Sequence, residues 1–129
     1  MIPRIDNFCD LEKLCNQECG VIFIWVNWSM FARNSAKIVE RLNCCWNQQH
    51  PSKKIEFLQI DLSDQFGDMW ENVRKWLESQ NITHSGELMF GGVGSIVFVQ
   101  SGTILHYVIN PNSETVGGLL KMMTQVFGD

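Results

Sequence analysis

The residues best suited to chemistry in this chain are its five cysteines and three histidines. A thiolate is the nucleophile of thiol–disulfide exchange, and an imidazole can act as a base or bind a metal. Cys44 and Cys45 are adjacent, and neighbouring side chains on a helix diverge by about 100°, so they cannot form a disulfide without breaking the helix. Cys15 and Cys19 lie four residues apart, a separation poorly suited to disulfide geometry. No cysteines and histidines show zinc-site spacing, and we expect neither a metal nor a cofactor.

Helix-like and strand-like segments alternate along the chain, which predicts a single α/β domain over residues 1–129. The apolar run Val21–Val26 is rich in β-branched residues and is typical of a strand buried on both faces. The expected helices cover residues 7–18, 31–48, 68–81 and 114–127, and the expected strands cover 21–26, 55–62, 95–100 and 103–109. The last two strands should form an antiparallel hairpin through Ser101 and Gly102.

Two of these helices show capping signals. Asp68 with Glu71 three residues later matches a capping box, and Ser113 is expected to cap the last helix. The expected buried face of that helix consists of Val116, Leu120, Met123 and Phe127. The segment Met1–Asp6 is too short to establish whether a further edge strand exists near the N-terminus.

The stretch Val21–Ala32 reads V-I-F-I-W-V-N-W-S-M-F-A. It resembles the central strand and active-site turn of the thioredoxin family, in which an apolar strand is followed by W-x-x-W-C-x-x-C at the start of a helix. Trp25 and Trp28 match the two tryptophans. Ser29 stands at the first cysteine position and Ala32 at the second.

A second match is Gly92–Gly102, which reads G-V-G-S-I-V-F-V-Q-S-G. It resembles the thioredoxin segment G-I-P-T with the strand that follows, so that Gly94 stands at the cis-proline position and Ser95 at the threonine. The resemblance extends over nearly the whole chain. It implies a thioredoxin-like fold, a three-layer α/β/α arrangement with a central mixed β-sheet.

The chain departs from the thioredoxin pattern at each part of the redox mechanism. Both thiols are missing, Phe23 stands where the family carries a buried acid, and Gly94 replaces the cis-proline. The resemblance therefore implies a divergent member that is not an enzyme and lacks ordinary thiol–disulfide oxidoreductase activity. Ser29 would need a general base to act as a nucleophile, and no histidine lies near it in sequence. We interpret Ser29 as the N-cap of the following helix.

Apolar side chains gather in this turn and in the loop that opposes it in thioredoxins. The expected interaction surface consists of Trp28, Met30, Phe31, Met89, Phe90 and Val93. These residues either form a binding face or pack on one another under the long segment before Gly92. The first reading predicts a module that binds an unidentified protein partner or forms a homodimer. The alternative is a divergent redox protein that uses a displaced cysteine such as Cys44.

Charge and hydropathy restrict the partners further. The formal net charge is −4 and no basic run is present, so we expect no nucleic acid. The longest apolar run is too short to cross a bilayer, and the N-terminus does not read as a signal peptide, so we expect no membrane association. We expect a cytoplasmic protein with reduced cysteines.

Overall fold

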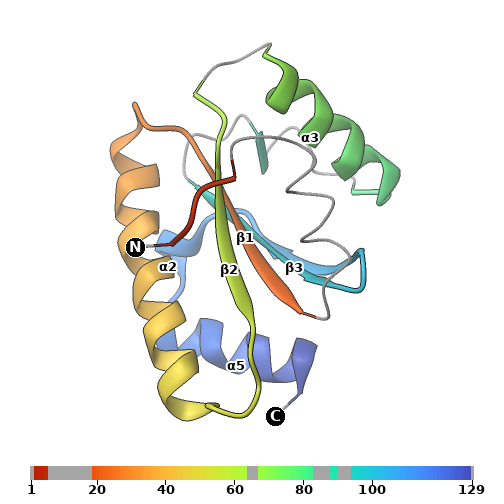
Figure 1. The fold of residues 1–129 in the computed structure, drawn as a ribbon. Coiled ribbons are helices and arrows are strands. Elements are labelled where there is room, and N and C mark those ends of the chain that lie inside the picture. The colour runs from red at the N-terminus through yellow and green to blue at the C-terminus, as the bar shows by residue number, and fades with distance from the viewer. Residues whose placement is uncertain (1, 6–18, 64–66, 83–87, 90–93, 129) are drawn as a thin grey trace.

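The computed structural model describes residues 2–5, 19–63, 67–82, 88–89 and 94–128. The helix expected over residues 7–18 lies outside these residues. In chain order the elements are β1 (Gly20–Trp25), α2 (Met30–Gln49), β2 (Glu56–Asp61), α3 (Asp68–Ser79), β3 (Ser95–Gln100), β4 (Thr103–Val108), the 3-10 helix η1 (Pro111–Ser113) and α5 (Val116–Phe127) (Figure 1).

The four described strands form one mixed sheet in the order β2-β1-β3-β4. β1 pairs in parallel with β2, and α2 makes the crossover that a parallel pair requires. β1 and β3 are antiparallel, as are β3 and β4, which confirms the predicted hairpin. The expected α/β class with a central mixed sheet is confirmed.

The N-terminal segment adds a short contact to the outer edge of β2. Arg4 forms an isolated parallel bridge with Gln59. The amide of Ile5 donates to the Gln59 carbonyl at 2.9 Å, and the Gln59 amide donates to the Pro3 carbonyl at 2.9 Å. Of the segment Met1–Asp6, the described residues 2–5 contribute this one bridge beside β2.

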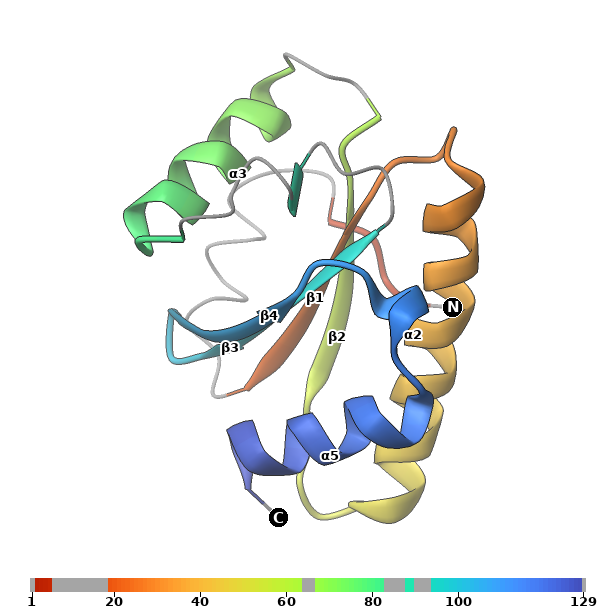
Figure 2. The same ribbon diagram turned by 180° about the vertical axis from the view of Figure 1, so that it is seen from behind.

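Side chains of β1 alternate between two cores, one on each face of the sheet. Val21 and Phe23 belong to the core under α2 and α5, while Ile22 and Ile24 belong to the core under α3. Figure 2 shows α2 and α5 meeting at one end of the molecule with α3 at the other. Because both faces of β1 are covered, its sequence is continuously apolar and not alternating.

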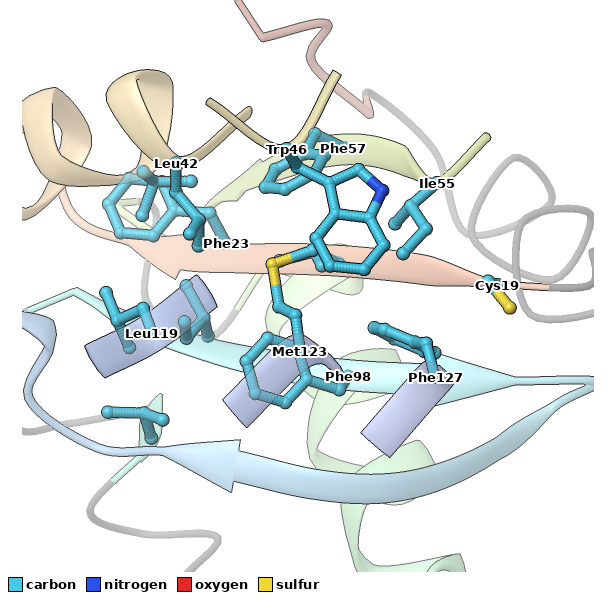
Figure 3. Close-up of a cluster of buried hydrophobic side chains, with 14 of the residues drawn as sticks. Cys19, Phe23, Leu42, Trp46, Ile55, Phe57, Phe98, Leu119, Met123 and Phe127 are labelled. Atoms are coloured by element: carbon cyan, nitrogen blue, oxygen red, sulfur yellow. The ribbon is translucent and has the colours of Figure 1, made fainter. Parts of the chain in front are cut away.

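The core under α2 and α5 is built mainly from aromatic and long aliphatic side chains. Trp46 of α2 and Met123 of α5 are fully buried and point toward one another (Figure 3). The rings of Phe98 and Phe127 pack edge to face, with centroids 5.8 Å apart. This packing fixes α2, and therefore the turn from which α2 starts, against the sheet.

The capping predictions for α3 and α5 are both wrong. Gly67 is the N-cap of α3 and makes no side-chain cap bond, so Asp68 is the first helical residue. Glu71 instead forms an ion pair with Arg74, whose hydrogen bond holds the pKa of the Glu71 carboxyl below its ordinary value. α5 is capped by Thr115, whose side chain accepts from the Gly118 amide at 2.9 Å.

The shift of the cap has a physical reason and a consequence for α5. Pro111 starts the 3-10 turn η1, and Ser113 is the last residue of that turn. α5 can therefore begin only after Ser113. The buried positions of α5 are Leu119, Met123 and Phe127, whereas Val116 and Leu120 are only partly buried. Among the described residues, no helix has the length and apolar content needed to cross a membrane.

Candidate functional site

The turn between β1 and α2 ends on Ser29, which caps the helix. Ser29 has extended backbone angles, and its hydroxyl accepts from the amide of Ala32 at 3.2 Å. Its own carbonyl accepts the helical hydrogen bond from Arg33 at 3.1 Å. The side chain is 7% exposed. The predicted N-cap is confirmed, and the hydroxyl is engaged in helix initiation.

The end of β2 holds the same turn in place. The amide of Asn27 donates to the Ser63 hydroxyl at 2.7 Å, and that hydroxyl donates in turn to the Asp61 carboxylate. The amide of Leu62 donates to the Trp25 carbonyl at 2.8 Å. These bonds tie the β1 side of the turn to the end of the neighbouring strand. Sequence reasoning did not identify this support, because residues 27 and 63 become neighbours only through the parallel pairing of β1 and β2.

Three large apolar side chains project into solvent from this turn. Trp28 is 59% exposed, Met30 73% and Phe31 64%. The Phe31 carbonyl accepts from the side-chain amide of Asn112 at 3.0 Å, and the same amide donates to the Ser35 hydroxyl at 2.7 Å. The first turn of α2 is therefore held on η1 as well. We call Trp28, Met30 and Phe31 the exposed apolar face.

Three residues of the predicted interaction surface, Met89, Phe90 and Val93, remain to be placed. Met89 is 4% exposed and lies in the core under α3 with Trp70, Val73 and Leu77, so it does not extend the exposed apolar face. The reason is that the sheet face opposite α2 needs apolar side chains to cover it, and Leu88 and Met89 supply part of that cover. Phe90 and Val93 lie outside the described residues.

The remaining positions that match the thioredoxin motif are used for packing. Ala32 is fully buried, and Trp25 stacks on Phe23 with ring centroids 6.0 Å apart. The hydroxyl of Ser95 donates to the Ile109 carbonyl at 2.6 Å, which ties β3 to the end of the hairpin. The Trp25 ring nitrogen is buried, and no partner for it is found in the described part of the chain.

The ring of Phe23 lies where a side chain on residue 94 would be. Gly94 has φ +76°, a left-handed value that favours glycine. A Cβ on residue 94 would lie 2.8 Å from Cε1 of Phe23 and 3.0 Å from Cβ of Ser35. The aromatic ring thus fills the place beside residue 94. Phe23 and Gly94, the two departures from the thioredoxin pattern, therefore fit together in packing.

Cys44, Cys45 and His50 lie far from Ser29 along α2. Cys44 is exposed on α2, and Cys45 is half-buried beside it. A rise of 1.5 Å per residue puts Cys44 about 20 Å along the helix from its start, and His50, at the C-cap, about 30 Å away. His50 stacks on Trp46 with ring centroids 4.0 Å apart, and His106 lies over Phe98. At that separation His50 cannot serve Ser29 as a base.

Histidine, cysteine, aspartate and glutamate side chains are the usual protein ligands of metal ions. Across residues 2–5, 19–63, 67–82, 88–89 and 94–128, no three of them are grouped so that they could hold a metal ion. His84, the remaining histidine of the chain, lies outside those ranges.

Comparison with solved structures identifies the same fold in other proteins. Thioredoxin from Trypanosoma brucei brucei aligns with a TM-score of 0.64 at 13% identity, covering 100% of this chain and 93% of that one. Thioredoxin from Malassezia sympodialis aligns with a TM-score of 0.62 at 16% identity, covering 98% of this chain and 91% of that one. Human ERp44 aligns with a TM-score of 0.66 at 16% identity, covering 96% of this chain.

The chain spans 29% of the length of ERp44, so it corresponds to one part of that protein. No protein-family model matches the sequence, and no curated protein matches it. At these identities the likeness is one of fold.

Proposed function

We propose that this chain, whose fold is that of the thioredoxins, is a protein-binding module without ordinary thiol–disulfide exchange activity. The observation that supports the proposal is the exposed apolar face, whose residues flank Ser29, the first cysteine position of the thioredoxin motif. Ser29 in that position caps a helix, and Ala32 is buried in the core. Neither side chain offers a redox group to a partner, whereas the residues between and beside them offer apolar area.

The size of the exposed apolar face suits a binding role. Full burial of an aromatic side chain covers about 150–250 Å², so three large side chains that are each roughly two-thirds exposed present about 400 Å². Patches of about 300–600 Å² on monomers are often functional. The turn is already fixed by hydrogen bonds to Ser63 and Asn112, which lowers the ordering cost of binding.

Two substitutions of matched chemistry test this proposal. Phe31→Asp should weaken recovery of a partner protein, or dissociate a dimer, by about 30-fold or more, as expected when a central aromatic anchor is lost. Leu105→Asp is the control, because Leu105 is 44% exposed on β4, away from the turn. Both variants should keep the wild-type circular dichroism spectrum. Equal recovery with both variants, or an unchanged oligomeric state in both, would show that the face is not an interface.

The redox part of the proposal has its own assay. The purified chain should not accelerate dithiol-dependent reduction of insulin above the buffer rate. Turnover that is also retained by Cys44→Ser would contradict the proposal, since it would require a thiol chemistry elsewhere in the chain.

The second candidate function is thiol chemistry at Cys44, and its exposure is the observation that favours it. Such a site would be separate from the exposed apolar face, because Cys44 lies about 20 Å along α2 from Ser29. Thiol-labelling kinetics at neutral pH separate the two functions. A Cys44 that reacts no faster than a free cysteine rules out the second candidate.

A further inference from the structure

A row of positive charges runs along the solvent side of α2 and begins beside the exposed apolar face. Arg33, Lys37 and Arg41 are all exposed, and they follow Met30 at intervals of three, four and four residues. On a helix this spacing puts them on one side, with about 6 Å of axial rise between successive members. We call Arg33, Lys37 and Arg41 the basic row.

No ion pair within the described part of the chain neutralises the basic row. The ion pairs of the described residues are those of Arg4 with Asp61 and of Arg74 with Glu71 and Glu78, and none includes the basic row. Glu40 is exposed on the same helix but does not pair with the neighbouring cations. The whole chain has a formal charge of −4, so the row is opposite in sign to the molecule that carries it.

A hollow accompanies the basic row toward the C-terminal end of α2. Its volume is about 440 Å³, and it is lined by Lys37, Glu40, Arg41, Cys44, Cys45 and Gln48. The lining combines two cations and the one carboxylate of Glu40 with two thiol side chains, so positive charge exceeds negative charge there by one. A partner side chain could enter this hollow while its carboxylate neighbours face the basic row.

We propose that the partner binds through an acidic segment that places an apolar anchor on the exposed apolar face and its carboxylates along the basic row. This inference rests on the proposed binding function and names its partner chemistry. The distance from Met30 to Arg41 is about 16 Å along the helix axis, which an extended segment covers with about five residues. Guanidinium groups bind carboxylates in a planar two-point geometry, so Arg33 and Arg41 suit glutamate and aspartate.

Charge and geometry favour this occupant over two others. A helix that lies on a membrane carries apolar side chains along its whole length, whereas the exposed apolar residues here stand at one end of α2 and the cations extend away from them. A second copy of the chain would need about 800 Å² on each partner for a standard interface, about twice the area of the exposed apolar face.

Fluorescence anisotropy with two labelled peptides of 12 residues tests the proposal. Each carries a Phe-Leu pair at one end, followed by four glutamates in one peptide and four lysines in the other. The glutamate peptide should bind and the lysine peptide should not. Lys37→Glu with Arg41→Glu should weaken the glutamate peptide about tenfold or more, because two attractive contacts become repulsive.

The matched control changes the same net charge elsewhere. Lys75→Glu with Lys121→Glu alters two exposed lysines on α3 and α5 and should leave affinity within about twofold. Equal effects of the two double variants would overturn the proposal, as would equal binding of the two peptides or binding of neither. Binding to phosphatidylserine vesicles without binding to the glutamate peptide would replace it with a membrane role.

The binding function and the acidic segment can fail independently of one another in these tests. If Phe31→Asp abolishes recovery of a cellular partner while Lys37→Glu with Arg41→Glu leaves recovery intact, the binding function stands and the acidic segment is wrong. Protection of Cys44 from a maleimide by the glutamate peptide gives a second, position-specific measure. A peptide that binds without protecting Cys44, and without dependence on the basic row, contradicts the inference.

Discussion

Ser29 stands at the first cysteine position of the thioredoxin motif, but in the structure it caps α2. A cysteine at the start of a helix would be favoured as a thiolate by the helix dipole, whereas the Ser29 hydroxyl is occupied by the amide of Ala32. Ala32 itself is fully buried, so a larger side chain there would have to displace core atoms. The two positions have become parts of the helix start and the core.

Restoring the two thiols should therefore recover little activity. In Ser29→Cys with Ala32→Cys, insulin reduction should stay below about a hundredth of the rate of a thioredoxin control, since proton transfer by a positioned group alone contributes that factor. Phe23 offers no such group. The measurement is turbidity during dithiol-driven insulin reduction, with Ser29→Ala plus Ala32→Cys as the single-thiol control. A double-cysteine variant near the thioredoxin rate would show that Phe23 and Gly94 do not limit the chemistry.

Among the elements, β1 and the segment before β3 are matched to one another through Phe23 and Gly94. The ring of Phe23 lies where a side chain at residue 94 would be, and the backbone at residue 94 has a positive φ. A proline at residue 94 would need a φ near −65°, so it could not be accommodated without rebuilding this segment. The departure from the thioredoxin pattern therefore includes the packing between these elements and not the turn alone.

Gly94→Ala tests this match. It should cost about 1–3 kcal/mol in the free energy of unfolding, because a left-handed backbone and an overfilled core both oppose the added methyl group. In a Phe23→Leu background the cost should fall, since part of the clash is removed. Urea unfolding of the four proteins gives the coupling, expected at about 1 kcal/mol. Additive effects of the two changes would mean that the ring and residue 94 do not compete for space.

For the whole molecule, two cores on opposite faces of one sheet hold the exposed apolar face rigidly in place. α2 is anchored by Val39, Leu42 and Trp46, all fully buried, while Met30 and Phe31 in its first turn remain exposed. The Trp46 ring nitrogen also donates to the Lys53 carbonyl at 3.0 Å, and the Lys53 ammonium donates to the Phe127 carbonyl at 2.8 Å. One helix therefore joins the core at its far end to the proposed binding surface at its start.

Trp46 should accordingly govern stability without contributing to binding. Trp46→Ala should lower the free energy of unfolding by about 3–5 kcal/mol, the usual cost of removing a buried aromatic ring. Trp46→Phe keeps most of the buried area and should cost less, mainly the hydrogen bond to Lys53, worth about 1 kcal/mol. Denaturant unfolding measures both. If Trp46→Phe were as destabilising as Trp46→Ala, the hydrogen bond and not the packing would be the main contribution.

Much of the fold and part of the site could be predicted from local sequence signals. The Ser29 cap follows from its place before a helix, and the strand at 21–26 follows from its apolar run. Thr115 as the cap of α5 could not be predicted, because it depends on how η1 folds after Pro111. The basic row was also missed, since its cations are four residues apart and form no contiguous run.

The sequence by itself determined the α/β order, the helix start at Ser29 and the absence of cysteines at positions 29 and 32. These depend on residue types and on spacings within one element, which are local properties. Only the tertiary structure decided that Met89 is buried, that Phe23 fills the space beside Gly94, and that Trp28, Met30 and Phe31 stay exposed. Burial depends on which distant segment covers a side chain, and that contact exists only once the sheet and its helices have assembled.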